Sequence, residues 1–318
     1  MGLQATRRAL LPSLALLLAA FAPARAARRH SAFSRSAASY AATLSRPRSG
    51  PYAYEWDEAY FPAWVDNYNF NANTSQATYQ ERYLINNSSW GGPGSPIFFY
   101  CGNEGFIELF ANNTGFLWES AVAFKALVVF AEHRFYGLSL PFGDASFEID
   151  NLALLSAEQA IADYAWLISS LKANLSATNS PVVLFGGSYG GMLAAWMRIK
   201  FPSAAVGAIA SSAPILQIPG VMDPAAYMSI VTADFTRANP LALMGVYNTF
   251  VAIQSAGATQ AGRDEISSTL GLCAPLESLD DAYGVIGWLE NAIGFMAMAD
   301  CKYATRSYAP APLAPSSI

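Results

Sequence analysis

The sequence predicts an α/β fold in which helices cover both faces of a mostly parallel β-sheet. Short continuous apolar runs, typical of strands buried on both faces, alternate with longer stretches whose apolar residues recur at helical spacing. This alternation is typical of βαβ units, in which successive strands run parallel. The expected strands are 79–85, 96–101, 126–131, 182–185 and 206–210, and the expected helices are 115–125, 156–171 and 192–201.

The alternation of strands and helices ends after Pro214, and this change divides the chain into two parts. Residues 222–270 and 280–298 are expected to be largely helical, without a further buried strand, so we expect a helical insertion beside the sheet. A chain of 318 residues is long enough for one large core with such a lid. The expected parts are a signal peptide (1–26), a flexible segment (27–50), an α/β core (51–215), a helical lid (216–300) and a Pro/Ala-rich tail (301–318).

A serine framed by glycines follows the expected strand 182–185. Residues 186–191 read Gly-Gly-Ser-Tyr-Gly-Gly, so Ser188 lies at the apex of a Gly-x-Ser-x-Gly turn that opens a helix. In α/β-hydrolases this turn exposes a nucleophilic serine above a helix N-terminus, which stabilises developing negative charge. The alternative is an ordinary glycine-rich turn. The strand before it and the helix after it favour the nucleophile, and with it an α/β-hydrolase fold with a helical lid.

The base that such a serine needs is missing from its usual place. The triad of these enzymes follows the order Ser, then Asp or Glu, then His. The two histidines of this chain, His30 and His133, both precede Ser188. His30 lies beside the N-terminal leader, and His133 ends the expected strand 126–131, where we expect it to bond neighbouring backbone. The sequence therefore predicts either an incomplete enzyme or a serine that works without the usual base.

Composition excludes several classes of protein. Hydrophobic residues make up 53% of the chain and charged residues 13%, which indicates a globular protein. The net charge of −5 gives no basic surface for nucleic acid. We expect no cofactor and no metal ion.

The N-terminus and several asparagines predict the secretory pathway. Arg7 and Arg8 precede an apolar run from Ala9 to Ala22, and small residues at 24 and 26 mark a signal-peptidase site. That run is too short to cross a bilayer, so we expect no membrane span. Glycosylation acceptor patterns begin at Asn73, Asn86, Asn87, Asn112 and Asn174.

The chain has three cysteines, an odd number that cannot all pair in disulfides within one secreted chain. Cys273 and Cys301 could form a disulfide across the helical region between them. Cys101 ends a buried strand and is expected to remain a small apolar thiol.

Several segments resemble the serine carboxypeptidases that cut after proline, the group of lysosomal Pro-X carboxypeptidase and dipeptidyl peptidase II. They are Phe99–Gly105, Asn112–Phe116, Phe130–Gly137, Ser139–Asp144, Glu158–Ala160 and the elbow as far as Trp196. The resemblance extends from about Val65 to about Ala299. It implies a secreted, lysosomal or vacuolar exopeptidase that forms an acyl-enzyme on Ser188 and takes peptides with proline near the scissile bond. It leaves a homodimer open.

The resemblance also suggests roles for the residues around Ser188. The backbone amide of Tyr189 and the turn Gly102–Asn103 are the expected oxyanion donors. Met192, four residues beyond Ser188 on the same helix face, could line a pocket for proline or simply pack against the sheet. Glu104 could anchor a peptide terminus or be an ordinary turn residue. Residues 132–134, which include His133, belong to the scaffold in such enzymes.

Departures from the family pattern limit the expected activity. Family members continue well past residue 318, through strands that carry the Asp and the His, and they tend to have His where this chain has Asn67. We therefore expect a C-terminally truncated chain, without the last strands of the sheet, that is impaired as a peptidase. The alternatives are an inactive remnant that acts as a binding protein and, less favoured by the flanking motifs, an esterase or lipase.

Overall fold

The computed structural model describes residues 54–70 and 77–299, which fall into two compact units that meet in sequence between Gln217 and Ile218. The described residues contain no helix that is both long and apolar enough to cross a membrane. Several predictions concern residues outside the described ranges: the leader, the segment 27–50, the tail 301–318, His30, Asn73 and Cys301.

The first unit is built on a six-stranded sheet with the order β1-β2-β4-β3-β5-β6. Strands β3 to β6 run parallel, whereas β2 pairs antiparallel with both β1 and β4. The mostly parallel sheet is therefore confirmed. The strands are β1 (Asp57–Trp64), β2 (Thr78–Asn86), β3 (Ile97–Cys101), β4 (Leu127–Ala131), β5 (Val182–Gly187) and β6 (Gly207–Ser211).

Strand β1 has no counterpart among the expected strands. It lies at an edge of the sheet and is largely exposed, so its residues lack a buried apolar pattern. Pro62 also lies within it, opposite Gln80 of β2. Proline cannot donate a ladder hydrogen bond and is tolerated mainly at edges, which explains why the pattern did not predict a strand here.

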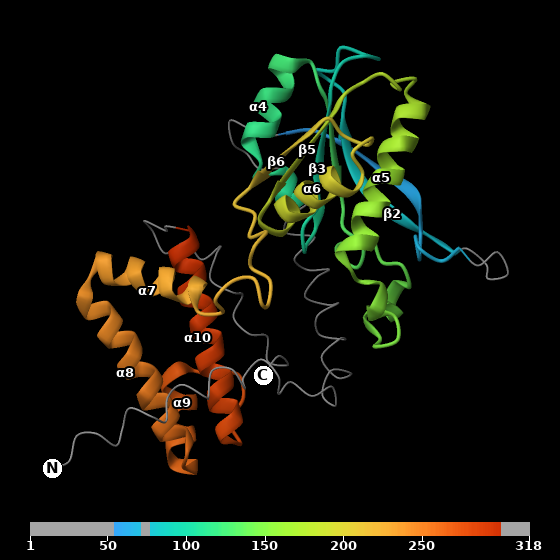
Figure 1. Cartoon of the computed structure of the whole chain (residues 1–318). Helices are drawn as coiled ribbons and strands as arrows, with labels where there is room; N and C mark the ends of the chain where they lie inside the picture. The colour runs from blue at the N-terminus through green and yellow to red at the C-terminus, as the bar shows by residue number, and fades with distance from the viewer. Residues whose placement is uncertain (1–53, 71–76, 300–318) are drawn as a thin grey trace. The chain divides into compact units, whose positions relative to one another are not determined.

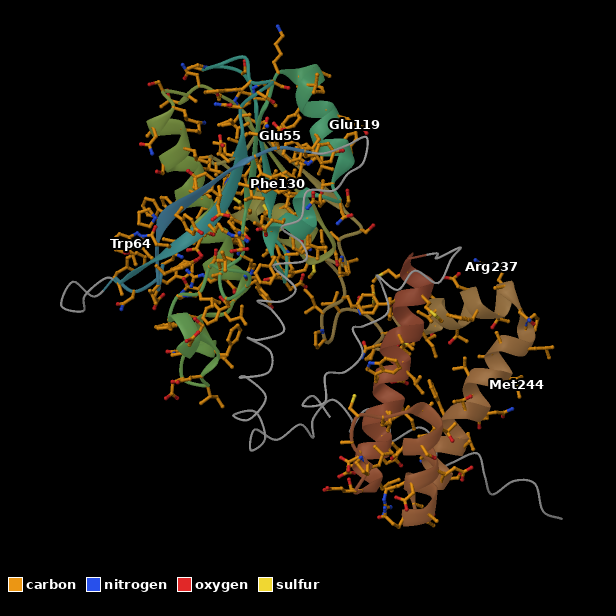
Figure 2. The ribbon with its side chains drawn as sticks, turned by 180° about the vertical axis from the view of Figure 1, so that it is seen from behind. Glu55, Trp64, Glu119, Phe130, Arg237 and Met244 are labelled. Carbon is orange, nitrogen blue, oxygen red and sulfur yellow. The ribbon has the colours of Figure 1, made fainter. Side chains whose placement is uncertain are left out.

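Helices cover both faces of the sheet, as predicted (Figure 1). Side chains of β3 and β4 alternate between the faces: Phe99 and Val129 pack with α5 and α6, whereas Tyr100 and Phe130 pack with α3 and α4. Phe130 lies deep inside this unit (Figure 2). The helices are α3 (Ile107–Ala111), α4 (Gly115–Phe124), α5 (Ala157–Asn174) and α6 (Ser188–Lys200), and the 3₁₀ turns are η2 (Gly143–Phe147) and η3 (Leu152–Leu154).

One helix start differs from expectation, and one agrees with it. Helix α6 begins at Ser188 itself, not at Met192, because Gly187 occupies the extended N-cap position. At α5 the Ser156 hydroxyl accepts the Gln159 amide, 3.3 Å away, as a capping box requires. The Gln159 side chain, however, contacts Asn67 and Asp66 in place of the Ser156 amide.

The second unit is helical wherever it has regular structure in the described residues 218–299. A small core of Ile253, Ile266, Leu276, Ala282 and Val285 holds its helices together. Its role as a lid remains a prediction. The helices are α7 (Ala226–Ala238), α8 (Pro240–Gly257), α9 (Gln260–Leu270) and α10 (Leu279–Ala299).

Candidate active site

Ser188 lies at a sharp turn between β5 and α6. Its φ of 53° is left-handed, a conformation that costs a non-glycine residue energy and persists only where the surroundings enforce it. Gly186 and Gly190 make the turn sterically possible. A Cβ on Gly186 would meet the Gly190 carbonyl, and a Cβ on Gly190 would meet the Cys101 carbonyl and the Asn103 side chain. The strand and helix therefore approach closely, as the Gly-x-Ser-x-Gly pattern predicts.

The turn leaves the serine accessible. Ser188 is exposed, and its hydroxyl makes no hydrogen bond within the described residues. It is the first residue of α6, whose first turn carries no acidic residue. The partial positive charge of the helix N-terminus thus faces the region where negative charge would develop on a reacting carbonyl oxygen.

The backbone amide of Tyr189 is placed to donate to such an oxygen. Tyr189 is the second residue of α6, so its N–H has no acceptor within the helix ladder. This position next to the serine agrees with the expected oxyanion role, which remains a prediction.

Asn103 connects the other expected oxyanion element to the serine turn. The Asn103 side chain is 4% exposed, and its Nδ2 donates to the carbonyl of Gly187, 2.7 Å away. Its Oδ1 accepts from the Tyr100 hydroxyl at 3.0 Å. The turn Gly102–Asn103 therefore lies against the residue that precedes Ser188. The side chain of Asn103, beyond its predicted backbone contribution, fixes the two segments to each other.

Gly102 explains how closely the strand ends approach. A Cβ on Gly102 would meet the Ala131 carbonyl at the end of β4. The Gly102 carbonyl accepts from the buried Tyr164 hydroxyl of α5, 3.1 Å away. The turn after β3 is therefore held both by the neighbouring strand and by the helix that covers it.

His133 is fully buried at the end of β4 and makes two hydrogen bonds. Its Nδ1 lies 2.6 Å from the Arg134 carbonyl, which agrees with the expected bond to neighbouring backbone. Its Nε2 lies 3.1 Å from the Tyr189 hydroxyl, a contact the sequence reasoning missed. Burial is the main cause that lowers the pKa of His133 to about 4; the hydrogen bond to the Arg134 carbonyl opposes this shift, and the positive charge of Arg134 adds to it. The imidazole is therefore neutral at neutral pH.

The residues on either side of His133 anchor its loop through buried ion pairs. Glu132 accepts from Arg82 at 2.7 Å and from the Ser139 hydroxyl at 2.9 Å. Gly137, at a φ of 57°, passes directly over the Glu132 carboxylate, where a Cβ would collide with it. Arg134 binds both oxygens of Asp163 on α5, at 2.6 and 2.8 Å. Residues 132–134 thus have the scaffold role that was expected of them.

The remaining predicted residues, those of the substrate pocket and the glycosylation sites, differ in how exposed they are. Met192 is half-buried one turn beyond Ser188, and Glu104 is exposed in the turn after β3. Asn87 and Asn174 are exposed, Asn112 is half-buried, and the Asn86 amide donates to the Glu55 carbonyl. Pocket and glycosylation roles remain predictions.

The described residues offer little to a metal ion or a disulfide. They contain no group of three or more His, Cys, Asp or Glu side chains that could hold a metal. Cys101 is a buried thiol whose pKa is raised by burial. Cys273 is exposed, and its predicted partner Cys301 lies outside the described ranges, so that pairing is untested.

One signal in the sequence could have revealed the contact of His133 with Tyr189. His133 lies two residues after the end of β4, Ser188 follows β5 directly, and carboxyl ends of parallel strands meet at one edge of a sheet. The pattern does not reveal that β3 separates β4 from β5. A tyrosine side chain is long enough to cover that distance, whereas the serine itself is not joined to His133.

The chain is similar to several known proteins. The family described as serine carboxypeptidase S28 matches residues 64–316. Human lysosomal Pro-X carboxypeptidase is 42% identical over 268 residues, which are 84% of this chain and 53% of that protein. Prolyl carboxy peptidase like protein 5 of Caenorhabditis elegans is 37% identical over 268 residues, 82% of this chain and 52% of that protein. A thermostable carboxylesterase of known structure, EstE1, is 14% identical with a TM-score of 0.40, over 64% of this chain and 60% of that one. The chain spans about half the length of the curated relatives it matches.

Proposed function

Since the chain belongs to the serine carboxypeptidase S28 family, we propose that it acts as a serine peptidase on prolyl peptides, with Ser188 as the nucleophile. One observation carries this proposal: an exposed serine held at a φ of 53° between β5 and α6, where glycines close the turn on both sides. Ser176 and Ser212 also have a left-handed φ. Ser188 is distinguished from them by its place as the first residue of α6, in a turn that Gly186 and Gly190 close.

The proposed reaction is acyl transfer. The Ser188 oxygen attacks the scissile carbonyl carbon, and the carbonyl electrons move onto the oxygen, which the Tyr189 amide and the Gly102–Asn103 turn would stabilise. Collapse of this intermediate breaks the C–N bond, releases the amine with a proton, and leaves an ester on Ser188. Water then attacks the ester carbonyl carbon, the C–O bond to Ser188 breaks, the acyl part leaves as a carboxylic acid, and a proton from the water returns to the serine oxygen.

The proton of Ser188 needs an acceptor during the attack. Within the described residues His133 is the only histidine, and its Nε2 already bonds the Tyr189 hydroxyl. We therefore propose that these 318 residues alone hydrolyse peptides poorly. A family-like C-terminal segment that carries an Asp and a His would supply the acid and the base.

The proposed substrate and compartment follow from the relatives. The human relative is named a Pro-X carboxypeptidase and lysosomal, so we propose peptides with proline near the scissile bond and a secretory or lysosomal route. Met192 is the proposed apolar wall for the proline ring, because it lies one helical turn from Ser188.

Labelling with a fluorophosphonate probe tests the nucleophile. The probe bonds activated serines, and mass spectrometry of the digested protein locates it. We expect the label on Ser188 in a chain extended by a family-like C-terminal segment, and no label in Ser188→Ala. No labelling of the extended chain would favour a binding protein without catalysis.

A substrate panel separates the peptidase from an esterase or lipase. The extended chain should cleave Pro-X peptides and leave long-chain esters largely intact. Faster cleavage of the esters would overturn the peptidase assignment while leaving Ser188 as the nucleophile.

A further inference from the structure

We propose that His133 is a positioning residue: a neutral hydrogen-bond acceptor that holds the Tyr189 side chain and thereby the oxyanion amide beside Ser188. This inference rests on the proposed function for its catalytic consequence, while its structural part can be measured in an inactive protein. The observation behind it is the 3.1 Å contact between His133 Nε2 and the Tyr189 hydroxyl.

The direction of this hydrogen bond follows from the other ring nitrogen. The Arg134 carbonyl, 2.6 Å from Nδ1, can only accept, so Nδ1 carries the proton of the neutral ring. Nε2 is then unprotonated and accepts from the Tyr189 hydroxyl. The Tyr189 side chain is therefore held by a donor–acceptor pair with one allowed orientation.

His133 is itself held rigidly enough to act as a fixed point. It is 0% exposed, and the Tyr136 ring packs edge-on against it with centroids 5.2 Å apart. Its neighbours Glu132 and Arg134 are each locked in a buried ion pair. The Tyr189 hydroxyl therefore bonds a buried imidazole whose two neighbouring residues are anchored by buried ion pairs.

With this contact, the residue before Ser188 and the residue after it are each fixed by a hydrogen bond to another part of the unit. Before Ser188, Asn103 binds the Gly187 carbonyl, and after it His133 binds the Tyr189 side chain. Between these two points Ser188 keeps its left-handed φ. Losing one hold would let the Tyr189 amide drift, and misplacement by about 1 Å can cost about 100-fold in rate.

Two isosteric variants of His133 separate positioning from mere packing. In His133→Gln the amide oxygen can replace Nε2 as acceptor for Tyr189, whereas in His133→Asn the shorter side chain can replace only the Nδ1–H bond to Arg134. In the chain extended by a family-like C-terminal segment, we expect His133→Gln to retain most of the rate at which the fluorophosphonate probe labels Ser188. We expect His133→Asn and Tyr189→Phe each to lower it by about tenfold or more, and their combination to lower it no further.

Nitrogen NMR of the imidazole reports the contact without catalysis. The chain has two histidines, so His30→Ala leaves one labelled ring to observe. At pH 7 we expect a neutral ring protonated on Nδ1, with an Nε2 resonance that shifts in Tyr189→Phe. We also expect the Tyr189 ring resonances to shift in His133→Asn and to stay close to their wild-type positions in His133→Gln.

The outcomes are distinct. A ring protonated on Nε2, an Nε2 signal indifferent to Tyr189→Phe, or equal labelling by the Gln and Asn variants would overturn the inference. A wild-type extended chain that does not label would end the proposed function. The tautomer and the Tyr189 ring resonances would then decide this inference alone.

Discussion

The side-chain amide of Asn103 donates to the carbonyl of Gly187, 2.7 Å away, and so joins the end of β3 to the residue that precedes Ser188. Because Asn103 also accepts from the Tyr100 hydroxyl, its orientation is fixed from both sides. The nucleophile turn is thus held by a neighbouring strand as well as by its own glycines.

Replacing Asn103 should loosen this turn. In Asn103→Asp the side chain loses its donor and faces the Gly187 carbonyl with a like partial charge, so we expect a loss of about 1–3 kcal/mol of unfolding free energy. Probe labelling of Ser188 should slow as well. Tyr100→Phe is the matched control, since it removes one hydrogen bond to Asn103 and leaves the Gly187 bond intact. Equal effects of both variants in urea unfolding and labelling would contradict this role.

The ion pair between Arg134 and Asp163 should be costly to break. Both side chains are fully buried, so Asp163→Ala leaves an unpaired buried charge and should lower the unfolding free energy by about 3–5 kcal/mol. The combined change Arg134→Met and Asp163→Leu should recover only part of this loss, because Arg134 also donates to the carbonyls of Trp64, Val65 and Leu154. The exposed pair Arg237 and Asp234 provides the comparison, because Arg237→Ala should cost under about 0.5 kcal/mol. Urea titrations measure both losses. Similar losses of unfolding free energy at the two pairs would contradict the claim that the buried pair is much costlier to break than the exposed one.

Glu81 should make the fold less stable as pH rises. It is fully buried, and no described group hydrogen-bonds either oxygen. Burial raises the pKa of Glu81 well above its ordinary value, and the nearby Asp163 raises it further, against the opposing charge of Arg134. Burial also raises the pKa of Asp163, but two hydrogen bonds from Arg134 oppose this rise. Of these two carboxyl groups, Glu81 is therefore the one that keeps its proton.

The sign follows from proton binding. Above the ordinary carboxyl value of 4.5 the unfolded chain has released a proton that folded Glu81 retains, so stability declines with rising pH up to the raised pKa. Glu81→Gln should remove this decline and make the protein relatively more stable at neutral pH. Thermal unfolding from pH 4 to 8 measures it, and a Gln variant with an unchanged slope would refute the account.

His133 should make the fold less stable at acidic pH. Its folded pKa of about 4 lies below the ordinary 6.5, so between these values the unfolded chain binds more protons. Stability should therefore fall as pH drops through this window, by about 3 kcal/mol at most near pH 4. His133→Gln should abolish this part of the acid destabilisation. An unchanged acid limb in the unfolding curve would contradict a buried neutral imidazole.

The sequence could predict the parts of the fold whose residues are buried in a regular pattern. Strands β3, β4 and β5 are continuous apolar runs because helices cover both of their faces. Strand β1 lacks that signal, since an exposed edge with Pro62 places no such demand on its residues. The nucleophile turn was predictable because local sterics alone require its glycines.

The contacts around Ser188 were harder to predict, because they depend on strand order. His133 and Tyr189 are 56 residues apart and Asn103 and Gly187 are 84 apart, so no local pattern records either bond. Asn103 was predicted for its backbone, whereas the structure shows its side chain holding the turn. Glu81 also escaped notice, since a single polar residue in a short strand looks like a solvent-facing position.

The rate of fluorophosphonate labelling at Ser188, compared between two chain lengths, tests the central claim most directly. The proposal is that Ser188 stands on a preformed nucleophile turn, and within the described residues no histidine bonds its hydroxyl. A chain extended by a family-like segment with an Asp and a His should label faster than the 318-residue chain by about 10⁴-fold or more. Ser188→Ala should abolish the label in both. If the 318-residue chain labels as fast as the extended one, and His133→Ala stops it, His133 is the base and the account is wrong.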